Sequence, residues 1–312
     1  MSASDRPTFH LFLPQAALTY EMLRDRAAVL ENLGYDGLWL VDHFWAEGNP
    51  DLDFLEGWTA LAGLAEATEK LRLGLMVSCN SYRNPCLLAK MASTVDHISR
   101  GRLELGLGAG WMESEYRGYG YEFPSMGTRL AQLGEGLQIV RGLLTDARTT
   151  FDGEHYQVRD APAEPKPVQR PLPITIGGAG ERKLLRLVAE HAQRWNCPMN
   201  AAADIERLRT VLAKHCDDVG RDVGEITVSE QTVVVIGKDE EDYKFRRSIA
   251  ERVAGSFADL DEYAVAGTPD VVIDGLRKKM SAGVTDFALI FGDFGMPDTL
   301  ELFATEVMPQ LA

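Results

Sequence analysis

The sequence contains few cysteines, and none of them is closely paired with another. The four thiols are Cys79, Cys86, Cys197 and Cys216, in a chain of 312 residues. Zinc sites and dithiol redox sites usually need a CxxC pair, so this spacing argues against both. Free reduced thiols are typical of cytosolic proteins, and we therefore expect a cytoplasmic protein without a metal site.

Positive charge and long apolar runs are also scarce. Lys and Arg number 32 against 47 Asp and Glu, which gives a formal net charge of −15. Nucleic acids and anionic membranes are bound by clustered Lys and Arg, so we expect neither as a partner. No apolar run reaches the roughly 18 residues of a membrane-spanning helix, and the N-terminal stretch lacks the pattern of a signal peptide. The oligomeric state, including a homo-oligomer, stays open.

Short aliphatic runs alternate along the chain with longer stretches of helical periodicity. The runs that predict strands cover residues 8–13, 36–41, 71–77, 102–107, 174–178, 194–197, 225–237 and 286–291. Strands that alternate with helices indicate a parallel sheet, and about eight such units predict an α/β fold of the closed (β/α)8 TIM-barrel type. An open sheet with a cap is the alternative.

The interval 149–158 interrupts this rhythm. Asp152 and Gly153 lie between two β-prone runs, which predicts a hairpin, and a Pro-rich connector follows at 161–173. We therefore expect one domain over residues 1–312, with an insertion at about 147–173 between strands 4 and 5.

In such a barrel the chemistry lies at the carboxyl ends of the strands. Small residues follow strands 4 and 5: Gly108, Ala109 and Gly110, then Gly177, Gly178, Ala179 and Gly180. Residues without side chains let another group approach the backbone closely and expose N–H groups, although plain turns are the alternative interpretation. The second loop directly precedes a predicted helix, whose N-terminus would suit a phosphate.

The end of strand 2 carries the best catalytic candidates, Asp42 and His43. A histidine exchanges protons near neutral pH, so His43 is predicted to act as an acid or base; a hydrogen bond to cofactor or backbone is the alternative. Glu113 and Glu115 open the next helix, where carboxylates suit the helix dipole regardless of chemistry. Aromatic residues predicted for the pocket rim are Phe12, Trp45, Trp58, Tyr82, Trp111 and Phe291, with a core position preferred for Trp58.

Several motifs in this order resemble a known family. They are "DGLWLVDHF", the stretch from "SYRNPCLLAK" to "GLGAGWMESEYRGYGYEF", "PITIGGAGERKLLRLVAEHAQRWN" and "AGTPDVVIDGLRKKMSAGVTDFALIF". The chain resembles the bacterial-luciferase-like flavin and deazaflavin oxidoreductases, and within them the branch that uses coenzyme F420. The resemblance implies a (β/α)8 barrel with an insertion after strand 4, and a tricyclic ring bound in the barrel mouth.

The resemblance also implies where the cofactor would bind. It places the ring across the ends of strands 3 and 4, with Asp42 near its polar edge and a bulge behind it. Family members often have a non-proline cis peptide in this bulge, here at Met76–Val77 or the next bond. The implied cofactor contacts are Asp42, Met76, Val77, Ser78, Asn80, Gly108, Ala109, Gly110, Trp111, Gly177, Gly178, Ala179 and Gly180.

The choice of cofactor depends on the turn after strand 4. FMN-binding members tend to place an Arg there, whereas this chain has Gly108, Ala109 and Gly110. We therefore expect F420 and hydride transfer to or from a small organic substrate. The alternatives are an FMN-dependent monooxygenase that uses O2, and a non-catalytic flavin- or deazaflavin-binding barrel. Trp111 stands where the glucose-6-phosphate-oxidising branch has a carboxylate, which argues against that substrate.

Overall fold

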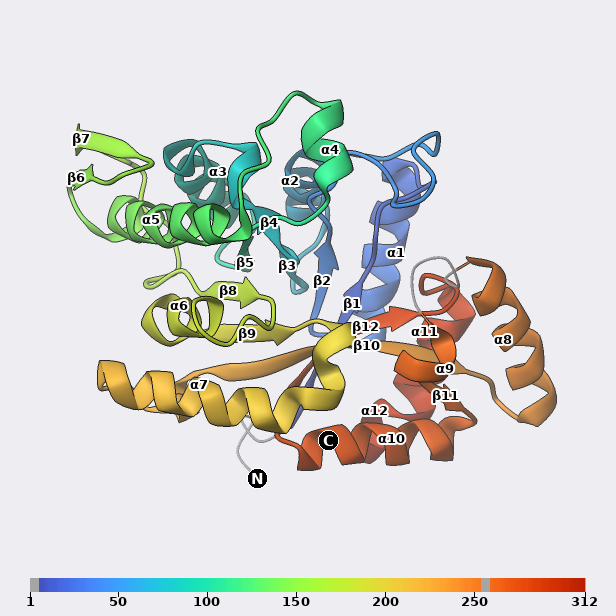
Figure 1. The fold of residues 1–312 in the computed structure, drawn as a ribbon. Coiled ribbons are helices and arrows are strands. Elements are labelled where there is room, and N and C mark those ends of the chain that lie inside the picture. The colour runs from blue at the N-terminus through green and yellow to red at the C-terminus, as the bar shows by residue number, and fades with distance from the viewer. Residues whose placement is uncertain (1–5, 254–258, 312) are drawn as a thin grey trace.

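The computed structural model describes residues 6–253 and 259–311, and in these residues eight parallel strands close into a barrel (Figure 1). The strands follow one another around the ring, which closes where β10 pairs with both β9 and β12. The barrel strands are β1 (Thr8–Phe12), β2 (Gly37–Leu40), β3 (Arg72–Leu75), β5 (Leu103–Gly108), β8 (Ile174–Gly177), β9 (Arg194–Cys197), β10 (Thr227–Ile236) and β12 (Asp286–Phe291). The TIM barrel predicted from the sequence is confirmed.

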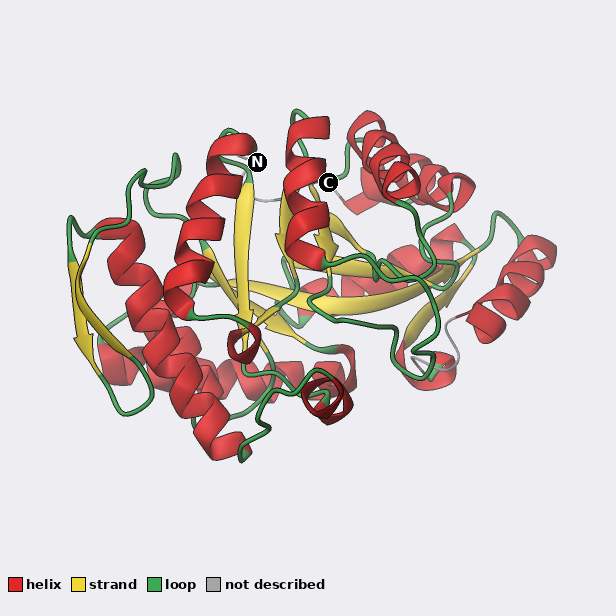
Figure 2. Ribbon diagram, turned by 90° about the horizontal axis from the view of Figure 1, so that it is seen from above, coloured by secondary structure: helices red, strands yellow, loops and turns green. Residues whose placement is uncertain are grey.

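Helices follow the strands and cover the outside of the barrel, as the view from above shows (Figure 2). They are α1 (Tyr20–Leu33), α2 (Gly57–Ala67), α3 (Pro85–Ile98), α5 (Met126–Thr145), α6 (Leu184–His191), α7 (Ile205–Val219), α8 (Glu240–Val253), α10 (Pro269–Ser281) and α11 (Pro297–Glu306). Local sequence explains their ends. The side chain of Thr19 accepts a hydrogen bond from Met22 N at the start of α1, and Gly34 ends that helix at φ 81°. Residues 242–257 also show helical periodicity in the sequence, and part of this interval lies outside the described residues.

The hairpin expected around Asp152 is present outside the barrel. β6 (Thr149–Asp152) and β7 (Gln157–Ala161) form their own two-stranded antiparallel sheet beside α5. Several shorter elements had no periodic pattern to predict them: β4 (Ser78–Cys79), α4 (Glu113–Gly118), α9 (Leu260–Tyr263) and β11 (Ala264–Gly267), whereas α12 (Met308–Leu311) lies in the helical stretch that α11 begins. Helices this short depend on tertiary packing rather than on periodicity.

Side chains alternate between the two faces of the barrel wall. Outward residues such as Leu38 and Leu105 are buried in the core between strands and helices. Inward residues form a second core, in which Trp39 lies among Phe12, Met76 and Ile290. The upper part of this inner core is the apolar floor of the barrel mouth. No helix among residues 6–253 and 259–311 has both the length and the apolar composition to cross a membrane.

The opposite end of the barrel holds a buried charge network. Asp286, which begins β12, is fully buried, with its Oδ2 3.4 Å from Arg194 Nη2 and 2.9 Å from His10 Nε2. Arg194 Nη1 also lies 2.7 Å from Glu104 Oε2. Burial alone would raise the pKa of Asp286, but the charges of Arg194 and His10 outweigh it and lower that pKa well below the ordinary value. This network joins four barrel strands from the inside.

Candidate active site at the barrel mouth

The predicted site residues come together because their strands are neighbours. β2 pairs with β3, β3 with β5 and β5 with β8, all parallel, so their carboxyl ends meet at one face. The ends of these four strands carry Asp42 and His43, Met76 and Val77, Gly108 to Trp111, and Gly177 to Gly180. The structure thus places the candidates from four strands around the barrel mouth.

The end of β3 carries the bulge implied by the family resemblance. The Met76–Val77 peptide bond is cis, at the first of the two positions expected. The half-buried Val77 side chain fills space left by glycines on the neighbouring strands. A Cβ on Gly106, Gly108 or Gly177 would lie 3.1, 2.5 or 3.1 Å from a methyl group of Val77. The close approach to the β5 backbone at Gly108 is therefore made by a side chain of the protein itself.

Gly110 is also packed against the protein. Its φ is +76°, and a Cβ there would lie 1.9 Å from the Tyr116 hydroxyl and 2.6 Å from Cys79 Sγ. Tyr116 and Cys79 are both buried, and the Tyr116 hydroxyl lies 3.0 Å from Cys79 Sγ. Burial raises the pKa of the Cys79 thiol to about 11, so this cysteine is an inert packing residue near neutral pH.

Two of the predicted cofactor contacts bind protein groups at the back of the mouth. Ser78 is fully buried and its Oγ accepts a hydrogen bond from Trp58 Nε1 at 3.1 Å. Asn80 is buried and its Nδ2 donates to the Tyr156 hydroxyl at 3.1 Å. β4 pairs Ser78 with Leu107, so the Ser78 backbone lies beside Gly108, but the side chains of Ser78 and Asn80 bind protein groups, and their contact with a cofactor stays a prediction.

Asp42 is held in a buried ion pair. Arg83 donates from Nη1 to Asp42 Oδ2 at 2.6 Å and from Nη2 to Oδ1 at 2.9 Å, and the Cys79 amide donates to Oδ2 at 2.7 Å. The Arg83 guanidinium balances the charge of the Asp42 carboxylate and holds it against the loop after β3. Arg83 was missed by the sequence analysis, although β2 and β3 are neighbours and their carboxyl ends were expected to meet.

His43 is hydrogen-bonded to a buried carboxylate. Its Nδ1 lies 2.7 Å from Glu115 Oε2, and 23% of the His43 side chain is exposed whereas Glu115 has no exposed surface. The same carboxylate accepts hydrogen bonds from Phe44 N at 2.5 Å and from the Tyr82 hydroxyl at 2.8 Å. With Nδ1 bound to Glu115, the remaining ring nitrogen of His43 is the one left for chemistry.

The charge of Glu115 is stabilised by these partners. Burial alone would raise the pKa of Glu115, but the hydrogen bonds from His43, Phe44 and Tyr82 outweigh it and lower that pKa. The carboxylate is therefore ionised near neutral pH and suited to hold a proton on His43 Nδ1. Sequence reasoning assigned Glu115 only to the helix dipole. Glu115 lies in a short segment without helical periodicity and is far from His43 along the chain, so the sequence did not indicate this contact.

Some of the aromatic residues predicted for the rim lie near His43, and others are buried in the core. Trp111 is 55% exposed and its ring meets His43 edge-on, with centroids 5.5 Å apart. Trp45 packs against Tyr119 nearby, with centroids 5.5 Å apart. Phe291 does not belong to the rim: it is fully buried on the outer face of β12. This correction follows from strand alternation, because the inward positions of β12 are Ala288 and Ile290. The core position preferred for Trp58 is confirmed.

The loop after β8 has backbone N–H groups without a protein partner. Within the described part of the chain, neither Ala179 nor Gly180 donates its amide hydrogen to any acceptor. Lys183 precedes α6 and makes no side-chain hydrogen bond to cap it. Amides without a protein partner, in a loop that leads into a helix N-terminus, are the donors that a phosphate needs. These amides therefore suit a phosphate, and cofactor binding by this loop stays a prediction.

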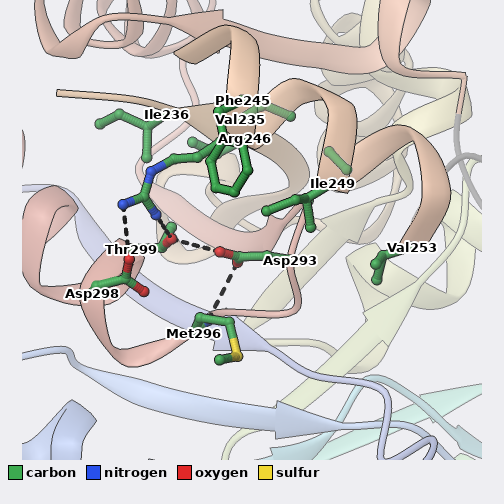
Figure 3. Close-up of a pocket in the computed structure, with 13 residues that line it drawn as sticks. Val235, Ile236, Phe245, Arg246, Ile249, Val253, Asp293, Met296, Asp298 and Thr299 are labelled. Carbon is green, nitrogen blue, oxygen red and sulfur yellow. Dashed lines mark hydrogen bonds and ion pairs between the residues drawn. The ribbon is translucent and has the colours of Figure 1, made fainter. Parts of the chain in front are cut away.

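A separate cavity of about 360 Å³ lies between α8, α11 and the ends of β10 and β12 (Figure 3). Apolar side chains including Phe245, Ile249 and Val253 face it. Its polar groups bind one another, since Arg246 donates to Asp298 at 2.8 Å and to Thr299 at 2.5 Å. None of the predicted catalytic or cofactor-binding residues lines this cavity.

Comparison with known proteins agrees with this geometry. Residues 7–286 match the family model described as luciferase-like monooxygenase. The chain belongs to this family. Its relatives include an F420-dependent enzyme, and similar solved structures include one with F420 and one with a modified FMN. A flavin or deazaflavin cofactor therefore fits this chain.

Curated relatives of this luciferase-like chain include two enzymes. It is 33% identical to an F420-dependent glucose-6-phosphate dehydrogenase of Intrasporangium calvum over 177 residues, 55% of this chain and 51% of the relative. It is 32% identical to a pyrimidine monooxygenase of Stutzerimonas stutzeri over 221 residues, 64% of this chain and 58% of the relative. The chain thus covers about half the length of the first curated relatives that it matches.

Solved structures share the fold over nearly the whole chain. An F420-dependent secondary alcohol dehydrogenase superposes with a TM-score of 0.88 at 18% identity, covering 98% of this chain and 99% of that one. The F420-dependent tetrahydromethanopterin reductase of Methanopyrus kandleri gives a TM-score of 0.84 at 20% identity, covering 98% and 100%. At such identities the likeness supports the fold alone.

Proposed function

We propose that this luciferase-like protein is an F420-dependent oxidoreductase that transfers a hydride between the deazaflavin and a small organic substrate. The observation that carries the proposal is the His43–Glu115 pair, in which a buried carboxylate holds a partly exposed imidazole at the barrel mouth. When bound, a deazaflavin supplies a ring carbon that accepts or donates hydride. The protein must then bind, orient and exchange a proton with the substrate.

The chain has a residue for each of these tasks. His43 takes a proton from the substrate as hydride leaves it, or returns that proton in the reverse direction. Glu115 is a positioning residue, since it keeps a proton on Nδ1 and so directs the other nitrogen to the substrate. The ion pair of Asp42 with Arg83 fixes the loop behind the ring site, and the Ala179 and Gly180 amides bind the phosphate.

F420 is favoured over FMN by the turn after β5. This turn consists of Gly108, Ala109 and Gly110, without the Arg that FMN-binding members tend to have. The relationship to an F420-dependent glucose-6-phosphate dehydrogenase supports this choice. The relationship to a pyrimidine monooxygenase favours the second candidate, an FMN-dependent monooxygenase that uses O2.

Titration of the purified apoprotein with F420 and FMN, side by side, tests the proposal. Bound deazaflavin absorbs near 400 nm and bound flavin near 450 nm, so each is followed separately (approximate values). We expect F420 to bind more tightly, and the loaded protein to exchange hydride with substrates from a panel of small alcohols and enones. Tight FMN binding without F420 binding would favour the monooxygenase. F420 binding without turnover of any panel member would leave a cofactor-binding barrel.

A further inference from the structure

A cleft of about 420 Å³ opens next to the His43 site. Its walls include Trp45, Pro50, Trp111 and Ser114, and the carboxylates of Glu47 and Glu113. The volume falls within the range of small-molecule pockets, about 300–1,000 Å³. Flat apolar side chains on the wall offer contact to a ring or to an alkyl ammonium group, and the carboxylates give the cleft a negative charge.

The cleft is connected to the proposed chemistry through its two tryptophans. Trp111 lines the cleft and also contacts the His43 ring, with centroids 5.5 Å apart. Trp45 lines the cleft, and its backbone N–H lies 3.3 Å from Glu115 Oε1. A molecule held between these side chains therefore lies against the residues that surround the acid or base.

The charged residues that line the cleft, Glu47 and Glu113, are both acidic. No Lys, Arg or His is among its lining residues. Arg117 binds Glu113, but both of its contacts go to Oε1 and its own side chain is 75% exposed. Arg83, in the loop after β3, is already paired with both oxygens of Asp42. A phosphate or carboxylate on the substrate would meet two carboxylates and no cation among the residues that line the cleft.

We propose that this cleft selects substrates that carry an organic cation, such as an aryl or alkyl ammonium, and disfavours anionic ones. The inference rests on the proposed function, because it assigns the substrate class of the same site. Indole faces attract ammonium groups through the ring quadrupole, and Glu47 and Glu113 add Coulomb attraction. Anionic substrates such as sugar phosphates are accordingly poor ligands for this member of the family.

Binding of three matched probes to the purified protein tests the proposal without turnover. The probes are benzylammonium, benzyl alcohol and benzoate, which share a phenyl ring and differ in charge. Titration calorimetry is carried out with and without bound cofactor. We expect benzylammonium to bind about tenfold more tightly than benzoate, with the alcohol between them, and the difference to shrink at high salt because exposed charges are screened.

Variants locate the binding and identify its cause. Trp111→Ala should weaken benzylammonium binding about fivefold, and the double variant Glu47→Gln/Glu113→Gln should remove the preference over benzyl alcohol. Phe245→Ala is the control, because Phe245 lines the separate cavity beside α8 (Figure 3). Equal affinity for the three probes, or a loss in the Phe245 variant instead of the Trp111 variant, would overturn the proposal. Either result leaves the cofactor titration unaffected, so the two failures are distinguishable.

Discussion

Glu115 Oε2 lies 2.7 Å from Nδ1 of His43, a contact between residues 72 positions apart in the chain. The Glu115 carboxylate also accepts hydrogen bonds from the Phe44 amide and the Tyr82 hydroxyl. These two bonds hold it in place independently of the histidine. A carboxylate bound to one ring nitrogen determines which nitrogen carries the proton. The pair therefore sets the orientation and the tautomer of the proposed acid or base.

Replacing Glu115 with Gln tests this positioning role. The amide keeps the shape of the carboxylate but not its charge, so it no longer enforces a proton on Nδ1. We expect turnover to fall about tenfold or more, and nitrogen NMR of His43 to change from one tautomer to a mixture. Glu66→Gln, at an exposed position on α2, is the control and should change neither quantity. An unchanged tautomer with normal turnover would make Glu115 a loop anchor only.

His43→Ala separates catalysis from cofactor binding. If His43 is the acid or base, turnover should fall about 10²–10⁴-fold while the dissociation constant of the cofactor changes much less. Both quantities are measured on the same preparation. His155→Ala, on the hairpin away from the mouth, is the matched control. Full turnover with weakened binding would assign His43 to the cofactor instead, and the proton would then come from another group.

The barrel was predictable from the sequence because each strand and helix carries its own periodic pattern. Strand ends could also be placed, since the carboxyl ends of parallel strands meet at one face. The close approach of a cofactor to Gly108 stays a prediction, and the sequence could not show that the Val77 side chain packs against this glycine. Glycines indicate crowding without identifying the neighbour.

The contacts of Glu115 and Arg83 were not predictable in the same way. α4 has six residues, too few for a periodic pattern, so nothing in the sequence showed that Glu115 is buried while Glu113 is exposed. Arg83 differs, because its loop follows β3 and Asp42 follows the neighbouring β2. A rule that pairs opposite charges on adjacent strand ends would have found this ion pair.

Gly110 and Gly120 form a matched pair for testing the packing at the mouth. Both have a φ of +76°, but a Cβ on Gly110 would meet Tyr116 at 1.9 Å whereas nothing lies within 4 Å of one on Gly120. Gly120→Ala should cost about 1 kcal/mol, from backbone strain alone. Gly110→Ala should cost a further 1–3 kcal/mol, roughly, from overpacking. Urea unfolding measures both, and equal losses would contradict the close packing at Gly110.

Asp286→Asn should destabilise the barrel and change its response to acid. Removing this charge takes away one of the two buried carboxylates that Arg194 contacts and the carboxylate that His10 contacts, which we expect to cost about 3 kcal/mol. Because the pKa of Asp286 is lowered by folding, its stabilising effect is complete above the ordinary aspartate pKa, about 4, and is lost as pH falls below it. The free energies of unfolding of the variant and the unsubstituted protein should therefore converge below about pH 4. A constant difference down to pH 2 would contradict this role.

The phosphate loop is best tested at Gly180. Gly178 is a poor choice, because its φ is +130° and a Cβ there would lie 2.8 Å from Leu184, so any larger residue would disturb the fold. Gly180 is exposed, and the nearest atom to an added Cβ is Leu184 Cβ at 3.3 Å. Gly180→Asp places a negative charge among the free amides before α6, where it would occupy those donors and repel a phosphate.

The Asp variant should bind the cofactor about tenfold more weakly or worse, whereas Gly180→Asn, with the same size and no charge, should lose much less. The comparison is made by titration at low and high salt, since repulsion between exposed charges weakens as salt rises. Unfolding by urea checks that both variants keep the stability of the unsubstituted protein. Equal affinities for the Asp and Asn variants would mean that the phosphate binds elsewhere, and that the loop after β8 is only a turn.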